Sequence, residues 1–110
     1  MFKNKKRFWA TTLLLLATHA TAFAEAGARA LKPADGYVPN ADTAIKIAIA
    51  VWEPIYGKEA IAAQAPYSAT LSDGIWFVTG SMPKPIRPGG TAMASIAQED
   101  GRIVFIGHGK

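Results

Sequence analysis

The sequence of 110 residues contains no cysteine. This absence excludes disulfide bonds, thiol catalysis and cysteine-based metal sites. Small exported domains often depend on disulfides, because a short chain can build only a small hydrophobic core. The chain must therefore gain its stability from packing, from a partner or from self-association.

Groups suited to catalysis are also scarce. His108 is the only histidine after residue 24, and a zinc site needs three or four ligands. No serine lies in a G-x-S-x-G turn, and the glycines match neither a P-loop nor G-x-G-x-x-G before a helix. Asp42 suits a helix start, and Asp73 and Asp100 suit turns. The sequence therefore predicts a protein that is not an enzyme and that holds no cofactor or metal.

The charge of the whole chain is misleading, because it comes from the N-terminus. The net charge is +4, and Lys3, Lys5, Lys6 and Arg7 lie among the first seven residues. In residues 25–110 the remaining eight basic residues balance eight acidic ones. A neutral domain offers no electrostatic case for nucleic-acid binding. It also has no net charge to oppose self-association, so a homodimer stays open.

The N-terminus has the pattern of a secretory signal peptide. The basic stretch MFKNKKR precedes an apolar run that ends in Ala22-Phe23-Ala24, whose two alanines are the small residues that a signal peptidase site needs. The alternative is a membrane anchor, but the apolar core is shorter than the about 20 residues that span a bilayer. We therefore expect removal of residues 1–24, export to the periplasm without stable membrane insertion, and a flexible leader over residues 25–36.

Residues 41–53 have the period of an amphipathic helix. Asn40 is a good N-cap, because its side chain can accept a hydrogen bond from a free backbone N–H. Pro54 and Gly57 favour an end at that point, with a kinked extension to residue 56 as the alternative. A short second helix is expected over residues 58–64. The apolar residues on the face of the first helix are Ala44, Ile45, Ala48, Val51, Trp52 and Ile55.

The stretch from residue 67 to residue 80 is typical of a β-hairpin. Asp73-Gly74 is a favoured two-residue turn, because both of its central positions require positive φ. The register that follows places alternate residues on opposite sides. The side expected to face the helix carries Ala69, Leu71, Trp76 and Val78. The other side carries Ser68, Thr70, Phe77 and Thr79.

A second hairpin is expected around Glu99-Asp100-Gly101. Its register stays open: Ile96 pairs with Phe105 across a two-residue loop, or with Val104 across a three-residue loop. Residues 103–106 are apolar on both faces of their strand. We therefore expect this strand to be central in the sheet or covered by a partner.

Together these elements predict an α+β domain over residues 37–110. One main helix and a short second helix pack on a four-stranded antiparallel sheet. Residues 82–90, with three prolines and two glycines, form the loop between the hairpins. Lys84 and Arg87 are the one local basic feature of this loop.

From Gly36 onward the sequence resembles a family of small bacterial immunity proteins with a nuclear transport factor 2-like fold. The stretches that carry the resemblance are GYVPNADTAIKIA, PIYGKEAIAAQAPY, DGIWFVTG, PGGTAMASI and DGRIVFIGHGK. The resemblance implies a cystatin-like or nuclear transport factor 2-like domain, truncated relative to the full cone. It also implies a protein partner, namely a cognate toxin that the protein would bind and block.

Two sets of residues are candidates for a role. The first contact surface for a partner is expected at Thr70, Phe77 and Thr79, together with Lys84 and Arg87. We also expect His108 near the C-terminus to form hydrogen bonds or to face the partner. The residues expected to mark the fold are Tyr56, Gly57, Gln64, Pro66, Tyr67 and Trp76.

Two other functions remain open. A periplasmic structural or ligand-binding module, unconnected to a toxin, could hold a small apolar ligand between helix and sheet near Ile55, Tyr56 and Trp76. An enzyme of the small-cone type would need an Asp or a His that points into a pocket.

Overall fold

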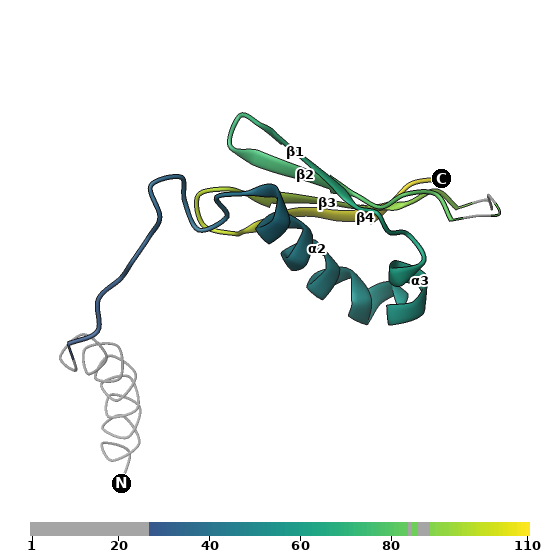
Figure 1. Ribbon diagram of the computed structural model, residues 1–110, viewed down its shortest axis with the longest axis horizontal. Coiled ribbons are helices and arrows are strands. Elements are labelled where there is room, and N and C mark those ends of the chain that lie inside the picture. The colour runs from purple at the N-terminus through teal and green to yellow at the C-terminus, as the bar shows by residue number, and fades with distance from the viewer. Residues whose placement is uncertain (1–26, 84, 86–88) are drawn as a thin grey trace, which may run out of the picture. The chain divides into compact units, whose positions relative to one another are not determined.

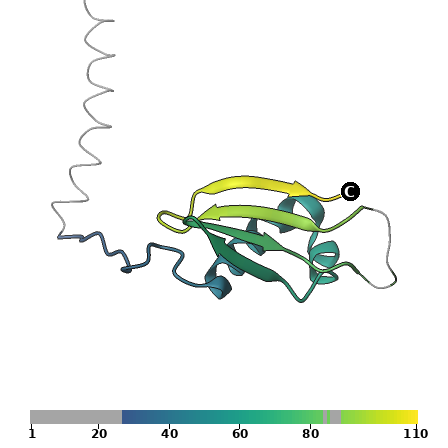
Figure 2. The same cartoon turned by 90° about the horizontal axis from the view of Figure 1, so that it is seen from above.

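A four-stranded antiparallel sheet with two helices on one face forms the fold (Figures 1 and 2). The computed structural model describes residues 27–83, 85 and 89–110, and residues 32–110 form one unit. The strands follow the order β1-β2-β3-β4. The α+β prediction is confirmed, whereas the predicted signal peptide lies outside the described residues. The elements are α2 (Ala41–Tyr56), α3 (Lys58–Ala62), β1 (Ser68–Ser72), β2 (Ile75–Thr79), β3 (Ala92–Ala97) and β4 (Ile103–His108).

The main helix α2 begins where its cap predicts and ends one turn later than its proline suggests. The Asn40 side chain accepts a hydrogen bond from the Thr43 backbone N–H at 2.9 Å. Pro54 lies inside the last turn, where its missing N–H removes a single helical bond. Gly57, with φ of 94°, donates its N–H to the Glu53 carbonyl at 2.9 Å and ends the helix. The alternative of an extension to residue 56 is therefore confirmed.

The core lies between α2 and the sheet. The helix buries Ala44, Ala48 and Trp52 at a spacing of four residues, and the two alanines let its backbone approach the strands closely. Tyr56 continues this spacing and is half-buried, whereas Ile55 is 57% exposed. The expectation that Ile55 continues the buried face is therefore wrong. The sheet contributes Trp76, Val78, Ala92, Ala94 and Ile96.

The two core tryptophans also bind backbone groups of distant segments. Trp52 donates its indole N–H to the Met93 carbonyl at 3.1 Å, and Trp76 donates to the Val38 carbonyl at 2.7 Å. A buried indole N–H without a partner would cost free energy. These two bonds therefore fix where the helix and the segment before it lie on the sheet.

The first hairpin has the register that its turn predicts. Asp73 and Gly74 both have positive φ, at 49° and 75°, and β1 pairs with β2 residue by residue as expected. Trp76 faces the core, whereas Phe77 is exposed. Leu71, expected on the core side, is 42% exposed, because β1 is an edge strand.

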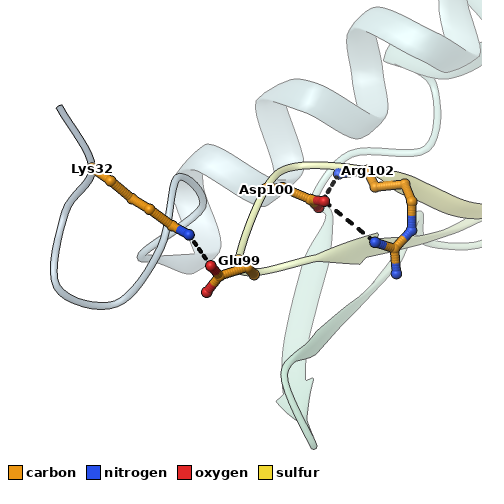
Figure 3. A network of polar contacts seen from close by, with 4 residues as sticks. All are labelled: Lys32, Glu99, Asp100 and Arg102. Carbon is orange, nitrogen blue, oxygen red and sulfur yellow. Dashed lines mark hydrogen bonds and ion pairs between the residues drawn. The ribbon is translucent and has the colours of Figure 1, made fainter. Parts of the chain in front are cut away.

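The second hairpin has a four-residue loop over residues 98–101. The Ala97 N–H donates to the Arg102 carbonyl at 2.9 Å and closes the loop. Asp100 supports it from inside, as Figure 3 shows: Oδ1 accepts from the Arg102 backbone N–H at 2.9 Å, and Oδ2 lies 3.3 Å from Arg102 Nη1. Gly101 has φ of 77°, which favours glycine at the end of the loop.

Both registers predicted for the second hairpin are wrong. Ile96 pairs with Ile103, and neither Val104 nor Phe105 takes that position. Val104 has no partner on β3 and forms a β-bulge. The cause is tertiary: the Gln98 N–H donates to a carbonyl in the turn of the first hairpin at 2.9 Å, which sets the loop length. Strand β4 therefore has one residue more than β3 between the paired positions, and Val104 is accommodated as the bulge.

The chain enters the domain across this same loop. The Tyr37 N–H donates to the Glu99 carbonyl at 3.1 Å, and Lys32 forms an ion pair with the Glu99 side chain (Figure 3). Gly36 is buried where an added Cβ would lie 2.4 Å from the Gln98 carbonyl oxygen. The segment expected to be a leader therefore contacts the domain from Lys32 onward.

The strand β4 is an edge strand, so the expectation that it is central is wrong. The central strand that is buried along most of its length is β3. Ile103, Val104 and Phe105 are 38%, 49% and 51% exposed. Of the two explanations for the apolar character of residues 103–106, coverage of β4 by a partner therefore stays a prediction.

Candidate partner-binding face

One face of the sheet is free of helices within the described chain (Figure 1). We call it the open face. The register fixes which side chains point to it, because alternate residues of each strand share a face. None of these positions carries a charged side chain. The open face consists of Ser68, Thr70, Ser72, Ile75, Phe77, Thr79, Met93, Ser95, Ala97, Phe105 and Gly107.

A cross-strand row lies at the centre of the open face. Phe77 on β2 and Phe105 on β4 flank Ser95 of β3, and Thr70 of β1 completes the row. The two phenylalanines are 49% and 51% exposed, whereas Ser95 is only 8% exposed. The row therefore presents two aromatic side chains with a small polar residue between them.

The neighbouring row shows how Phe105 is placed. A Cβ added to Gly107 would lie 2.5 Å from the Phe105 ring, so this ring lies over the glycine. Met93, which pairs with Gly107, is 39% exposed. Any side chain at position 107 would displace the ring from the open face.

The structure brings only some of the predicted partner-binding residues together. Thr70, Phe77 and Thr79 lie on the open face, as expected from the first hairpin. His108 pairs with buried Ala92, and its ring lies 5.3 Å from the Tyr56 ring of α2, so it lies on the helix side of the sheet. Lys84 and Arg87 lie outside the described residues.

Sequence reasoning missed Met93, Ser95 and Phe105 as members of the open face. These residues belong to the second hairpin, and only its register shows which face they share with Phe77. The one signal was the apolar character of residues 103–106 on both faces. That signal indicates an exposed apolar strand but not the side to which Phe105 points.

The corner over residues 57–67 places the sheet relative to α2. Gln64 is 4% exposed; its side-chain oxygen accepts from the Ala92 N–H at 2.8 Å, and its carbonyl accepts from the Ser81 N–H at 2.6 Å. A Cβ at Gly80 would lie 2.4 Å from the Gln64 Oε1 atom. Gln64 therefore joins the corner to β3 and to the segment after β2.

Other fold-marker residues lie around Gln64. The Tyr67 hydroxyl donates to the Ile61 carbonyl at 2.6 Å, and its ring centroid lies 6.1 Å from that of Trp52. The peptide bond before Pro66 is cis. These contacts explain the residue types in the corner through packing and backbone geometry.

The comparison with known families identifies the chain. The family described as NTF2 fold immunity protein matches residues 43–110, which include most of α2 and all strands. The chain belongs to this family. The match contains the complete open face and the whole corner.

The chain is also similar in sequence to a bacterial protein. The uncharacterized protein YhhH of Escherichia coli strain K12 is 33% identical over 73 residues, which are 66% of this chain and 58% of YhhH. The chain thus spans less than two thirds of the length of this relative. No solved structure matches the chain.

The described part of this immunity-family protein can also be compared with the requirements of a metal site and of a membrane span. No group of three or more His, Asp or Glu side chains lies close enough to hold a metal ion there. No described helix is long and apolar enough to cross a membrane. What the described surface offers is the open face.

Proposed function

We propose that the protein is an exported immunity protein that neutralises a cognate toxin by binding it directly. Membership of the NTF2 fold immunity family supports a toxin partner. The row of Phe77, Ser95 and Phe105 supports the open face as the contact surface. Centres of protein–protein interfaces are depleted of charged residues and enriched in aromatic residues and Met. The open face shares these features in its Phe77, Phe105 and Met93 side chains and in its lack of charged residues.

The same composition favours binding over catalysis. Half-exposed aromatic side chains are typical anchors of interfaces, where burial of the exposed half of each contributes about 1 kcal/mol or more. The proposed mechanism is occlusion, in which one complex protects against the toxin for as long as it persists. Neutralisation is then stoichiometric, and protection at a small fraction of the toxin concentration would contradict it.

The alternative of a small ligand between helix and sheet is disfavoured by the structure. Ile55, which was expected beside such a ligand, is 57% exposed. Trp76 is 8% exposed and its indole N–H is bonded to the Val38 carbonyl. Both features leave these residues unsuited to lining a shared apolar pocket.

Substitution of both phenylalanines tests the contact surface. The double variant Phe77→Ala and Phe105→Ala removes the aromatic anchors, and we expect roughly hundredfold weaker binding to the cognate toxin, which is first sought among the products of the neighbouring genes. Isothermal titration calorimetry measures this affinity. Ile55→Ala is the matched control, because it removes an equally exposed apolar side chain outside the open face.

Two outcomes would overturn the proposal. One is unchanged affinity in the double variant, which would place the contact elsewhere. The other is that the wild-type protein neither binds the neighbouring toxin nor protects cells that receive it. Circular dichroism of each variant confirms that its fold is retained.

We also propose that the chain acts in the periplasm after cleavage behind Ala24. The motivation is the basic and apolar pattern of residues 1–24. After expression of the full chain, cell fractionation and N-terminal sequencing of the purified protein should yield Glu25 as the first residue. An intact N-terminus on protein from the cytoplasm or the membrane fraction would contradict this proposal.

A further inference from the structure

Among the described residues, nothing covers the open face of the edge strand β4 or pairs with its outer edge. The helices pack mainly across β1, β2 and β3, and Ile103, Val104 and Phe105 are exposed. An apolar edge strand is a template for pairing with another chain, and monomeric proteins commonly protect such edges with Lys or Pro. Strand β4 contains neither.

The opposite edge of the sheet differs in character. Strand β1 has the sequence SATLS, with small and hydroxyl-bearing residues, whereas β4 has the sequence IVFIGH. The bulge at Val104 interrupts the start of β4 only. Residues 105–109 are left as a regular stretch that contains no Asp, Glu, Lys or Arg.

The hydrogen bonds to β3 show which backbone groups of β4 are free to bind another strand. The Gly109 N–H donates to the Thr91 carbonyl at 2.8 Å. In an antiparallel ladder alternate residues face the same neighbour, so Phe105 and Gly107 also face β3. Ile106 and His108 therefore direct their N–H and C=O groups to the free edge.

We propose that two copies of the chain pair through these edges, with antiparallel β4 strands related by a two-fold axis at Gly107. Ile106 of each copy then lies across from His108 of the other. The two pairs exchange four N–H to carbonyl hydrogen bonds and join the sheets into one. At the axis the two copies of Gly107 meet without side chains between them.

The second copy is favoured over another occupant by self-complementarity. A two-fold contact needs one surface to match itself, and an antiparallel strand edge centred on Gly107 does so by symmetry. Charge does not oppose this arrangement, because residues 103–109 contain no Asp, Glu, Lys or Arg that would meet a like charge across the axis. The domain has no net charge to oppose the contact.

Pairing at β4 would enlarge the surface that the open face offers to a partner. With strands about 4.8 Å apart and a rise of about 3.3 Å per residue, the four strands cover about 350 Å². A stable interface buries about 800 Å² on each partner. Two copies joined at β4 place their open faces side by side and double the continuous surface. This consequence rests on the proposed function, whereas the dimer itself does not.

The test compares two substitutions at one position. His108→Pro removes a free-edge N–H that β3 does not use, whereas His108→Ala keeps it. Each proline removes one N–H, so the two prolines in a dimer remove two of the four bonds, and we expect the dissociation constant to rise about thirtyfold. The alanine variant should stay close to wild type. Sedimentation equilibrium of the exported protein, over a range of concentrations, measures the mass.

Leu71→Pro serves as the control at the other edge. Its N–H points away from β2, because Ser72 pairs with Ile75 next to the two-residue turn. This variant should dimerise like wild type. Unfolding of any variant is detected by circular dichroism.

Amide hydrogen exchange provides a readout that needs no substitution. The amides of Ile106 and His108 should become protected as the wild-type concentration rises, because only edge pairing covers them. A wild-type protein that stays monomeric would overturn the proposal. A dimer in which these two amides still exchange freely would also overturn it, because the contact would then lie away from the β4 edge. A dimer that Phe77→Lys dissociates would overturn it too, because that result indicates stacking of the open faces. None of these measurements involves the toxin, so their failure leaves the proposed toxin binding untouched.

Discussion

At the scale of the residue, Gln64 shows how much one side chain can determine. It is buried, accepts from the Ala92 N–H through its side chain, and accepts from the Ser81 N–H through its carbonyl. Gly80 is required beside it, because a Cβ there would lie 2.4 Å from its side-chain oxygen. One glutamine thereby links a helical corner to two segments that are distant in sequence.

A double-mutant cycle tests this pair. Gln64→Ala leaves the buried Ala92 N–H without its acceptor, which should cost about 1–3 kcal/mol of unfolding free energy. Gly80→Ala should cost a similar amount through the clash. In the double variant the clash with the Gln64 Oε1 and Cδ atoms is gone, whereas the Cβ of residue 64 still lies 2.8 Å from the new methyl group. The total should therefore be less than the sum, but only by the part of the clash that the removed atoms cause.

Urea unfolding followed by tryptophan fluorescence measures the three variants. Gly74→Ala is a useful comparison, because nothing lies within 4 Å of a Cβ at Gly74 but φ is 75°. Its cost arises from backbone strain alone, so adding Gln64→Ala should be additive. Strict additivity of Gln64→Ala with Gly80→Ala would instead refute the proposed contact.

At the scale of the element, the sequence predicts well wherever local chemistry decides. Asn40 marks the start of α2, and Asp73-Gly74 determines the register of the first hairpin. In both places the deciding hydrogen bond or dihedral angle lies within a few residues of the signal. The core face of α2 was likewise visible in the recurrence of Ala44, Ala48 and Trp52.

The second hairpin shows where this reasoning fails. Its loop length depends on the Gln98 N–H, which donates to the turn of the first hairpin, and on the Glu99 carbonyl, which binds Tyr37. No pattern within residues 92–108 contains that information. The bulge at Val104 follows from it, and so does the membership of Phe105 in the open face. The part of the open face on the second hairpin could therefore not be predicted, whereas Thr70, Phe77 and Thr79 on the first hairpin could.

At the scale of the whole molecule, the lack of disulfides and the two exposed apolar surfaces both bear on how such a small domain is stabilised. A domain of this size with a small core gains little stability from burial alone. Here the open face and the β4 edge leave Phe77, Phe105 and Val104 in solvent. Association is the means left to such a chain for removing apolar surface from water.

The two proposed interfaces should be separable in their effects on each other. Phe77→Ala with Phe105→Ala should weaken toxin binding roughly a hundredfold. The dimer should stay intact, because the edge bonds use backbone groups. His108→Pro should yield monomers that bind the toxin more weakly, because a single open face of about 350 Å² is small for a stable interface. His108→Ala should retain both the dimer and the affinity.

Calorimetric titration with the toxin gives the affinity and the stoichiometry of each variant together. If the footprint extends over the joined faces, each toxin molecule binds two copies of the chain, and the monomeric variant loses both affinity and this ratio. If His108→Pro monomers bind with wild-type affinity in a ratio of one to one, the footprint lies within one copy. The dimer would then be independent of neutralisation, and the toxin would have to reach beyond the described sheet to bury enough surface.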